Sequence, residues 1–473
     1  MLRTPKLRDH VHVALLAGVA WLPISFVHTG YAWDDWVLAI LTVDQRAEWH
    51  RELARFAPIS LYIFDAFGSP GVRLAVSLAL AATGIAVYKI FDRFDVFSRR
   101  ELIFLAVFTA VNPLDSAKSL LSTSTYSISV ALFYGGWLLL TSRRFWFLAL
   151  PLFFTSFDTG SLAYFALLPF TVLLLKAARD RDRSSLLPLT GLTIAVVTFG
   201  VYRFLIRPAN GAYAGYNNPA LWGQILALGL ALSILVFSTL CYRSNELVFF
   251  AGRQDMTIFT AGFFSFAIGL VPYLAVGKYP PFVSMLSRHS LLLGLGTSLL
   301  AISIARFGSP SQKFQELTMR IGLILTISVA WFHCFLFYHY LDFVEDVSGK
   351  VGEIAIPPNT LVVVSYERDG WARLSETVGP NFANSFYVWN SLVSLAQESR
   401  SDIFSIHESD FEFYLQGILS PAYGRGSDRF GSETFAPSKS AIMLQIRRLG
   451  AEWTLMPNYS VAARAVNIPL PKE

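Results

Sequence analysis

The chain has 473 residues and a formal charge of +5; 54% of its residues are hydrophobic and only 15% are charged. Soluble domains carry about 25% charged residues, so this composition excludes an ordinary water-soluble protein. The basic residues lie in short clusters between apolar runs, which argues against nucleic acid as a partner. Apolar runs recur from Val11 to Tyr340, and the composition becomes mixed from Leu341 onward. The sequence therefore predicts a membrane domain at 1–341 and a small soluble α/β domain at 342–473.

The first 341 residues contain about eleven candidate membrane spans, because a helix needs about 20 apolar residues to cross the hydrocarbon core. This count predicts an all-α polytopic membrane domain. The candidate spans cover residues 11–28, 71–91, 102–113, 125–141, 145–157, 161–176, 187–206, 219–241, 257–276, 289–306 and 320–341. Those at 102–113, 145–157 and 161–176 are short, and they need tilt, local thinning of the bilayer or burial among neighbours.

The distribution of Lys and Arg predicts how the spans are oriented. Arg3, Lys6 and Arg8 precede the first apolar run, which places the N-terminus inside. That run contains Trp21 and Pro23 and lacks a small-x-small exit, so it is predicted to stay as the first span rather than be cleaved. An odd number of spans then places the C-terminal domain outside.

The first outer loop contains an acidic pair, Asp34 and Asp35, between Trp33 and Trp36. Tryptophan favours the membrane interface, so both carboxylates are expected at headgroup depth. The segment that follows, at about 36–56, has the spacing of one or two amphipathic helices lying in the interface. One interpretation of the pair is a helix N-cap with a first-turn acid. The other is a general base, since adjacent carboxylates raise one another's pKa.

Two further acids, Asp115 and Asp158, lie at the ends of apolar runs on the same outer side. Acids at such positions are costly unless they face water or have a function. Each also fits a simpler interpretation as part of a capped turn, because Asp115 closes Asn112-Pro-Leu-Asp and Asp158 precedes Thr-Gly. His333 and His339, six residues apart in the last span, are interpreted as packing or interface residues.

Four outer cations near span ends are candidates for binding a lipid phosphate, together with a neighbouring histidine. Arg binds phosphate through a fork of N–H groups, whereas Lys acts as a point charge. The candidates are Arg203, Arg207, Lys278, Arg288 and His289. The alternative for each cation is snorkelling to ordinary lipid headgroups.

The segment from Tyr31 to Trp36, which reads YAWDDW, carries a resemblance to the GT-C fold glycosyltransferases. Weaker support comes from Lys278-Tyr-Pro-Pro, from Ser287-Arg-His and from the proline turn and apolar run at 356–364. The chain is similar to this class in its inside N-terminus, its first span and its long outer loop with an acidic pair. The class includes protein O-mannosyltransferases and bacterial enzymes that modify lipid A or O-antigen.

The resemblance implies transfer of a sugar from a polyprenyl-phosphate donor to a glycan, lipid or protein acceptor. It implies Asp34 or Asp35 as the catalytic base, with Asp115 or Asp158 as a second acid beside the base or at a metal. No cofactor is assigned, and a divalent cation stays an open alternative with no ligand named. The expected location is a bacterial inner membrane, with the site and the C-terminal domain facing the periplasm.

The C-terminal domain is expected to hold a strand at 362–364, helices within 371–397, a helix at 440–449 and a final strand at 452–456. It contains no Gly-rich phosphate loop or nucleophile elbow, so we expect substrate recognition or a lid over the site. Two other functions remain as alternatives. They are a transporter or flippase for an envelope lipid or glycan, and a non-enzymatic membrane scaffold.

Overall fold

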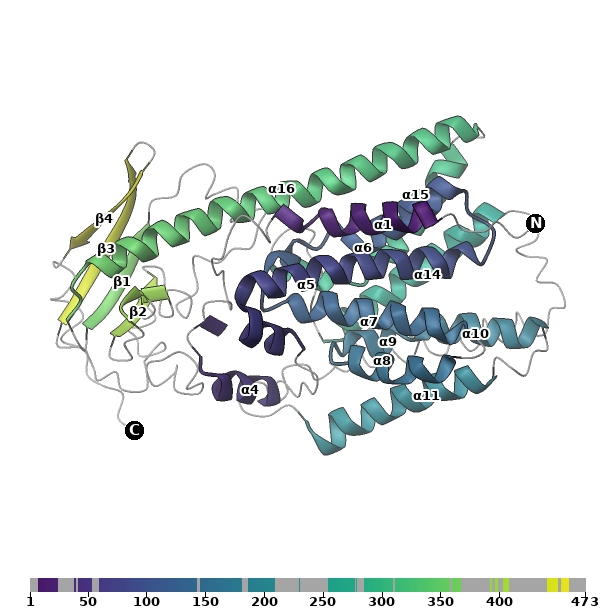
Figure 1. Cartoon of the computed structure of the whole chain (residues 1–473), viewed down its shortest axis with the longest axis horizontal. Coiled ribbons are helices and arrows are strands. Elements are labelled where there is room, and N and C mark those ends of the chain that lie inside the picture. Colours follow the sequence, from purple (N-terminus) through teal and green to yellow (C-terminus); the bar gives the residue numbers. More distant parts are fainter. Residues whose placement is uncertain are drawn as a thin grey trace.

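The computed structural model describes a bundle of helices with a small sheet at one end (Figure 1). The described residues are 7–23, 38–39, 41–52, 59–142, 145–180, 186–208, 229, 254–276, 278, 285–308, 311–357, 360–366, 392–393, 396–398, 403–407, 440–449 and 452–458. Among them, four helical segments are long and apolar enough to cross a membrane: Ile59–Asp92, Leu186–Ile206, Asp255–Ala275 and Gln312–Tyr338. The chain is therefore a helical membrane protein, and the count of about eleven spans stays a prediction.

The helices follow the predicted apolar runs along the chain. They are α1 (Leu7–Val19), α4 (Val43–Glu52), α5 (Ile59–Asp92), α6 (Arg99–Val111), α7 (Ser124–Leu140), α8 (Ala149–Ser156), α9 (Ser161–Phe165), α10 (Leu167–Asp180), α11 (Leu186–Val201), α14 (Gln254–Ala275), α15 (Leu293–Gly308) and α16 (Gln312–Glu353). Short turns are η1 (Ser116–Ser119), η2 (Trp146–Leu148), η4 (Tyr202–Ile206) and η6 (Met285–Ser290). The predicted span at 219–241 lies outside the described residues except for Gly229.

Helix α5 has a kink near its start, and a partly buried ion pair holds the segment before the kink. Gly68 adopts a φ of 64°, a left-handed conformation that glycine tolerates best, and Pro70 follows it. Before the kink, Asp65 accepts a bond of 2.5 Å from Arg46 of α4. Arg46 also donates to the carbonyls of Leu38 and Leu41. A helix thus lies within the predicted interfacial segment 36–56, and its place at a membrane surface stays a prediction.

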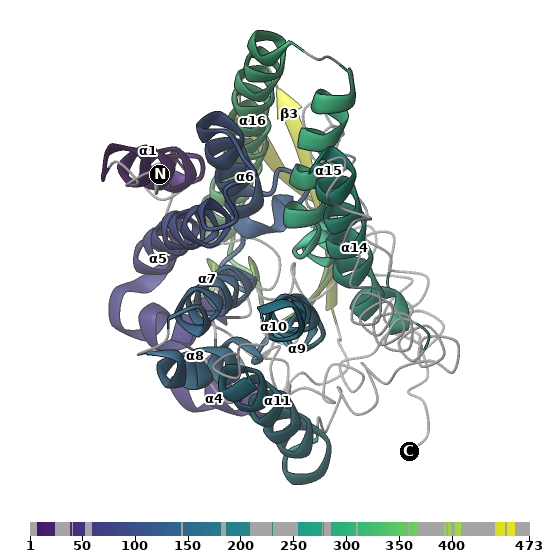
Figure 2. The same cartoon turned by 90° about the vertical axis from the view of Figure 1, so that its right-hand side faces the viewer.

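Glycines allow α14 and α15 to pack closely side by side (Figure 2). A Cβ atom added at Gly296 would lie 2.4 Å from the Phe266 backbone nitrogen, and one at Gly269 would lie 2.7 Å from the Leu292 oxygen. Both distances are shorter than van der Waals contact. Small residues at such crossings let helix backbones approach one another, which is common in membrane bundles.

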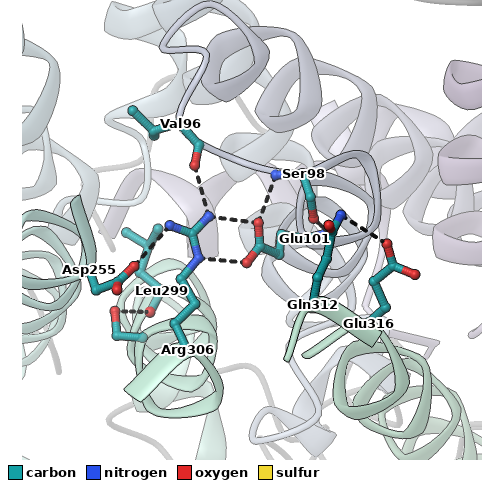
Figure 3. Close-up of polar contacts among 9 residues, drawn as sticks. Val96, Ser98, Glu101, Asp255, Leu299, Arg306, Gln312 and Glu316 are labelled. Carbon is teal, nitrogen blue, oxygen red and sulfur yellow. Dashed lines mark hydrogen bonds and ion pairs between the residues drawn. The ribbon is translucent and has the colours of Figure 1, made fainter. Parts of the chain in front are cut away.

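The first turn of α6 lies near the N-terminal end of the bundle, where ion pairs join it to neighbouring helices, and Figure 3 shows its contact with Arg306. Glu101 is bound by two bonds of 2.7 Å from Arg306 of α15, which also reaches Asp255 of α14 at 3.2 Å. The two preceding residues, Arg99 and Arg100, pair with Asp9 of α1 and Glu316 of α16, respectively. We call these seven residues the α6 ion-pair hub. Three consecutive side chains thus tie α6 to α1, α14, α15 and α16.

Helix α16 runs from the N-terminal end of the bundle to the sheet (Figure 1). The strands are β1 (Thr360–Tyr366), β2 (Ile403–His407), β3 (Ser440–Leu449) and β4 (Glu452–Asn458), in the order β2-β1-β3-β4. β1 pairs in parallel with β2 and β3, and β4 runs antiparallel to β3.

Two of the strand predictions are confirmed, and one helix prediction is wrong. β1 contains the predicted strand 362–364, and β4 contains the predicted strand 452–456. Residues 440–449, however, form β3 rather than a helix. Ile442 and Leu444 are buried while Met443 and Gln445 are half-buried, an alternation typical of a strand. Most of the segment 371–397 lies outside the described residues.

Candidate functional site

Two short turns distant in the sequence meet toward the sheet end of the bundle and form a seam of buried hydrogen bonds. η1 follows α6, and η6 precedes α15. The Asn112 side-chain amide donates to the carbonyl of Ser290 at 2.9 Å, and the Ser290 hydroxyl donates to the Leu114 carbonyl at 2.9 Å. We call these contacts, with those of Ser287 below, the η1–η6 seam. It fixes the two turns in one arrangement.

Ser287 lies at the centre of the seam and is fully buried. Its Oγ accepts from the Ser116 backbone nitrogen at 3.0 Å and from the Ala117 nitrogen at 3.2 Å. It also lies 3.0 Å from the Ser116 Oγ. A hydroxyl has two acceptor lone pairs and one donor, so two N–H bonds leave Ser287 to donate its proton to Ser116.

Asp115 precedes η1 and is 2% exposed. Among the described residues its Oδ1 atom has no hydrogen-bond partner, and its side chain makes no capping bond to η1. Burial raises the pKa of Asp115 to about 6, while Lys118, the Ala117 N–H and Arg288 lower it by smaller amounts. A buried carboxylate with a free oxygen and a pKa near neutrality is suited to proton transfer.

Lys118 provides the positive charge closest in sequence to Asp115 and is itself buried. Its Nζ donates to the carbonyls of Val111 at 2.6 Å and Ala110 at 3.3 Å, at the C-terminal end of α6. A cation is favoured there because the last carbonyls of a helix carry partial negative charge. Burial lowers the pKa of Lys118 to about 8, and Asp115 partly offsets this effect.

Two further cations lie in this region: Arg288 of η6 acts on Asp115, and Lys278, which follows α14, acts on Arg288. Burial and the charge of Arg288 together lower the pKa of Lys278 to about 8. Next to Arg288, His289 packs on the ring of Tyr273, with centroids 5.4 Å apart. The Tyr273 hydroxyl lies 3.2 Å from the Ser161 hydroxyl of α9. The site therefore joins α9, α14 and both turns.

His333 of α16 closes one side of the seam. Its Nε2 lies 3.3 Å from the Pro113 carbonyl, and its ring stacks on Trp21 with an interplanar angle of 7°. These contacts support the packing interpretation of His333, whereas the side chain of His339 lies outside the description. No group of three or more His, Cys, Asp or Glu side chains in the described part of the chain is arranged to hold a metal ion.

Comparison with known proteins adds no relative to these observations. No protein-family model, curated protein or solved structure matches the chain. Function must therefore be argued from the site itself.

The structure brings together part of the predicted site. Asp115, Lys278, Arg288 and His289 gather around the η1–η6 seam. Asp158 lies half-buried in the turn between α8 and α9, three residues before Ser161. Asp34 and Asp35 lie outside the described residues, so their predicted role is carried forward unchanged.

Arg203 and Arg207 lie on another flank of the bundle. Both follow α11, in the turn η4 and directly after it. α11 packs against α8 and α10, away from α15 (Figure 2), whereas η6, which contains Arg288, packs against α14, and Lys278 follows α14 in the chain. The five predicted phosphate ligands are therefore divided between two flanks.

Sequence reasoning missed Lys118, Ser287 and Ser290 as members of the site. Lys118 is not among the predicted site residues, although its place after an acid in a short turn is a usable signal. Ser287 entered the sequence analysis only as part of Ser287-Arg-His, and nothing in the sequence indicates the contacts of either serine, because their partners lie 171 and 176 residues away in the chain. Only the packing of η1 against η6 reveals them.

Proposed function

We propose that the protein is a membrane glycosyltransferase that moves a sugar from a polyprenyl-phosphate donor to a glycan, lipid or protein acceptor. The observation that carries the proposal is the position of Asp115, a buried carboxylate with an unpartnered oxygen that lies within the field of Arg288, which in turn acts on Lys278. Such a pairing of a proton-transfer group with cations is what transfer from an anionic lipid donor requires.

In this proposal the donor phosphate binds to Arg288 and Lys278. Arg288 offers forked N–H donors, and Lys278 adds a mobile point charge. Burial and, to a smaller extent, repulsion from the charge of Arg288 lower the pKa of Lys278 to about 8. A bound phosphate relieves that repulsion and stabilises the negative charge that grows as it leaves the sugar.

The acceptor hydroxyl loses its proton to Asp34 or Asp35 as it attacks the anomeric carbon, as the resemblance implies. Asp115 is the second acid of this scheme. With a pKa of about 6, it exchanges a proton near neutral pH and can take up the proton that the base has accepted. Asp158 has less support for this role. Its turn is linked to the site only indirectly, by the contact between the hydroxyls of Ser161 and Tyr273.

The α6 ion-pair hub favours an enzyme over a transporter. A transporter must open its binding site alternately to both faces. Opening the N-terminal end would separate Arg306 from Glu101 and Asp255, and Glu101 and Arg306 are each about a tenth exposed or less. Breaking a buried pair is strongly unfavourable. A site open toward the sheet end alone is sufficient for an enzyme.

Binding of undecaprenyl phosphate to the purified protein in nanodiscs tests the donor site. We expect saturable binding that weakens at least about tenfold in Arg288→Ala and in Lys278→Ala, since a charge-assisted bond contributes about 1.5 to 3 kcal/mol. Arg320→Ala, an exposed cation on α16, is the control and should bind as the wild type does. Equal binding by all four proteins would contradict the proposed donor site, and weakening by Arg207→Ala alone would move it to the α11 flank.

A further inference from the structure

The N–H groups at the start of η1 are accepted by Ser287, although Asp115 is the residue that the sequence places to cap this turn. Asp is among the preferred N-cap residues, and its carboxylate ordinarily accepts the N–H of the second or third residue of the turn. Here Asp115 occupies the N-cap position of η1 without a capping bond. The Ala117 N–H, which is the second of the turn, donates to Ser287 across the seam, and its effect on the Asp115 carboxylate is smaller than that of burial or of Lys118.

Ser287 is well placed to take over this role. Its hydroxyl is fully buried and uses both lone pairs on the N–H groups of Ser116 and Ala117. The adjacent bond from Ser290 to the Leu114 carbonyl keeps η6 against the residue that precedes Asp115. Ser287 thus accepts both N–H groups at the start of η1, and only the Ala117 N–H also acts on the Asp115 carboxylate.

We propose that Ser287 is a positioning residue that caps η1 from the opposite turn and so keeps the Asp115 carboxylate available inside the site. The proposal deepens the proposed function, on which its consequence for catalysis rests. The arrangement itself rests on the contacts of Ser287 alone. Without the Ser287 hydroxyl, the Asp115 carboxylate is the nearest acceptor for the Ala117 N–H, and it would turn toward its own backbone.

The charged and titratable groups around Asp115 must be considered before the change in its pKa on removal of the Ser287 hydroxyl can be predicted. Asp115 is near Lys118 within η1, Arg288 on η6 and Tyr273 on α14, while His333 on α16 is near Lys118. None of these groups is altered by removing the Ser287 hydroxyl. The Ala117 N–H already lowers the pKa of Asp115, and without Ser287 it has the carboxylate as its acceptor alone. The stronger bond stabilises the charged form further, so the pKa of Asp115 should fall below its present value of about 6.

The titration of Asp115 in the full-length protein tests this directly and needs no substrate. Infrared spectra recorded against pH show the C=O band of the protonated carboxyl, which is assigned to Asp115 by its loss in Asp115→Asn. We expect the midpoint to fall by about one pH unit or more in Ser287→Ala. Ser287→Cys, which keeps nearly the same volume but is a weak acceptor, should shift the same way if the alanine variant does not fold.

Ser290→Ala is the matched control, because it removes a seam bond without freeing the N–H groups of η1. Its Asp115 midpoint should equal that of the wild type. An unchanged midpoint in Ser287→Ala or Ser287→Cys would overturn the proposal, and so would an equal shift in Ser290→Ala, which would indicate general loosening of the seam. If transfer activity is present, the acid limb of its pH profile should shift with the midpoint. A protein with no transfer activity but a shifted midpoint would refute the proposed function and leave the role of Ser287 standing.

Discussion

Arg306 binds both carboxylate oxygens of Glu101 at 2.7 Å, and this pair joins α15 to the first turn of α6. Arg306 also donates to the Val96 carbonyl at 2.8 Å and lies over the ring of Phe97. Glu101 in turn accepts the Ser98 backbone N–H at 2.7 Å, which completes a capping box. The Glu101 carboxylate thus caps the N-terminus of α6 and also binds α15 through Arg306.

Replacing Glu101 by Gln should therefore destabilise the bundle. The change removes one of the two anionic partners of Arg306, whose charge is nearly buried. We expect the free energy of unfolding to fall by roughly 2 to 3 kcal/mol after discounting for partial solvent access. Thermal unfolding in detergent measures it. Glu316→Gln, which affects the more exposed pair with Arg100, should lower stability by less than about 1 kcal/mol. Equal losses in the two variants would contradict a central role for Glu101.

The close crossing of α14 and α15 predicts that Gly296→Ala is destabilising. The added methyl group would meet the Phe266 backbone, which cannot move without shifting α14. Overpacking of this kind costs about 1 to 3 kcal/mol. Gly308→Ala is the control on the same helix, because its added methyl group meets nothing within 4 Å. A melting temperature of Gly296→Ala at or above that of Gly308→Ala would refute the close packing.

The ion pair between Arg46 and Asp65 predicts that α4 is held to the start of α5. Asp65→Asn removes the charge that faces Arg46, so α4 should open more often and expose the bond after Arg51 to trypsin. If the free energy needed to open α4 falls by about 1.4 kcal/mol, cleavage at this bond should become about tenfold faster. Mass spectrometry identifies the cleaved bond. Asp44→Asn, an exposed acid of α4, should change the rate less than twofold, by about the size of a helix-dipole term. Similar rates for wild type and Asp65→Asn would show that the pair does not hold the helix.

Asp115 predicts a pH dependence of stability with a definite sign. Its pKa is raised from 3.8 to about 6 in the folded state, so the folded protein binds more protons than the unfolded chain between these values. Stability from this group is therefore present at low pH and is lost as pH rises from about 4 to about 6. The full loss is at most about 3 kcal/mol.

Asp115→Asn isolates this contribution from that of other carboxyls. The stability difference between wild type and variant should move against the wild type as pH rises from 4.5 to 7.5, measured by unfolding in detergent. Asp44→Asn, at an exposed position, should show no such trend. A difference that is independent of pH would mean that Asp115 titrates as an ordinary exposed carboxyl.

The membrane helices were predictable from the sequence because long apolar runs have few alternatives. The strand at 440–449 was not, because Ala441 to Leu444 is a continuous apolar run that fits a helix or a strand equally well. Pairing with β1, from Thr360 with Ser440 to Tyr366 with Ile446, decides the matter. That pairing is a long-range contact that the local pattern does not contain.

The candidate site divides in the same way. Asp115 and Arg288 could be found as charged residues beside apolar runs, where their presence has an energetic cost. The sequence could not show that Asp115 lacks a capping bond, since a residue before a turn is expected to cap it. The bond from the Ser116 N–H to Ser287, 171 residues away in the chain, is visible only in the folded structure.

The most direct measurement of the central claim is consumption of polyprenyl-phosphate sugars by the purified protein in nanodiscs. Donors carrying different hexoses and pentoses are supplied with an envelope extract as acceptor, and released polyprenyl phosphate is quantified. We predict turnover of at least one donor, with a loss of about 100-fold or more in Asp34→Asn/Asp35→Asn and in Asp115→Asn, a range typical of proton-transfer groups. Undiminished turnover in the Asp34→Asn/Asp35→Asn protein, or no release from any donor by the wild type, would contradict the account.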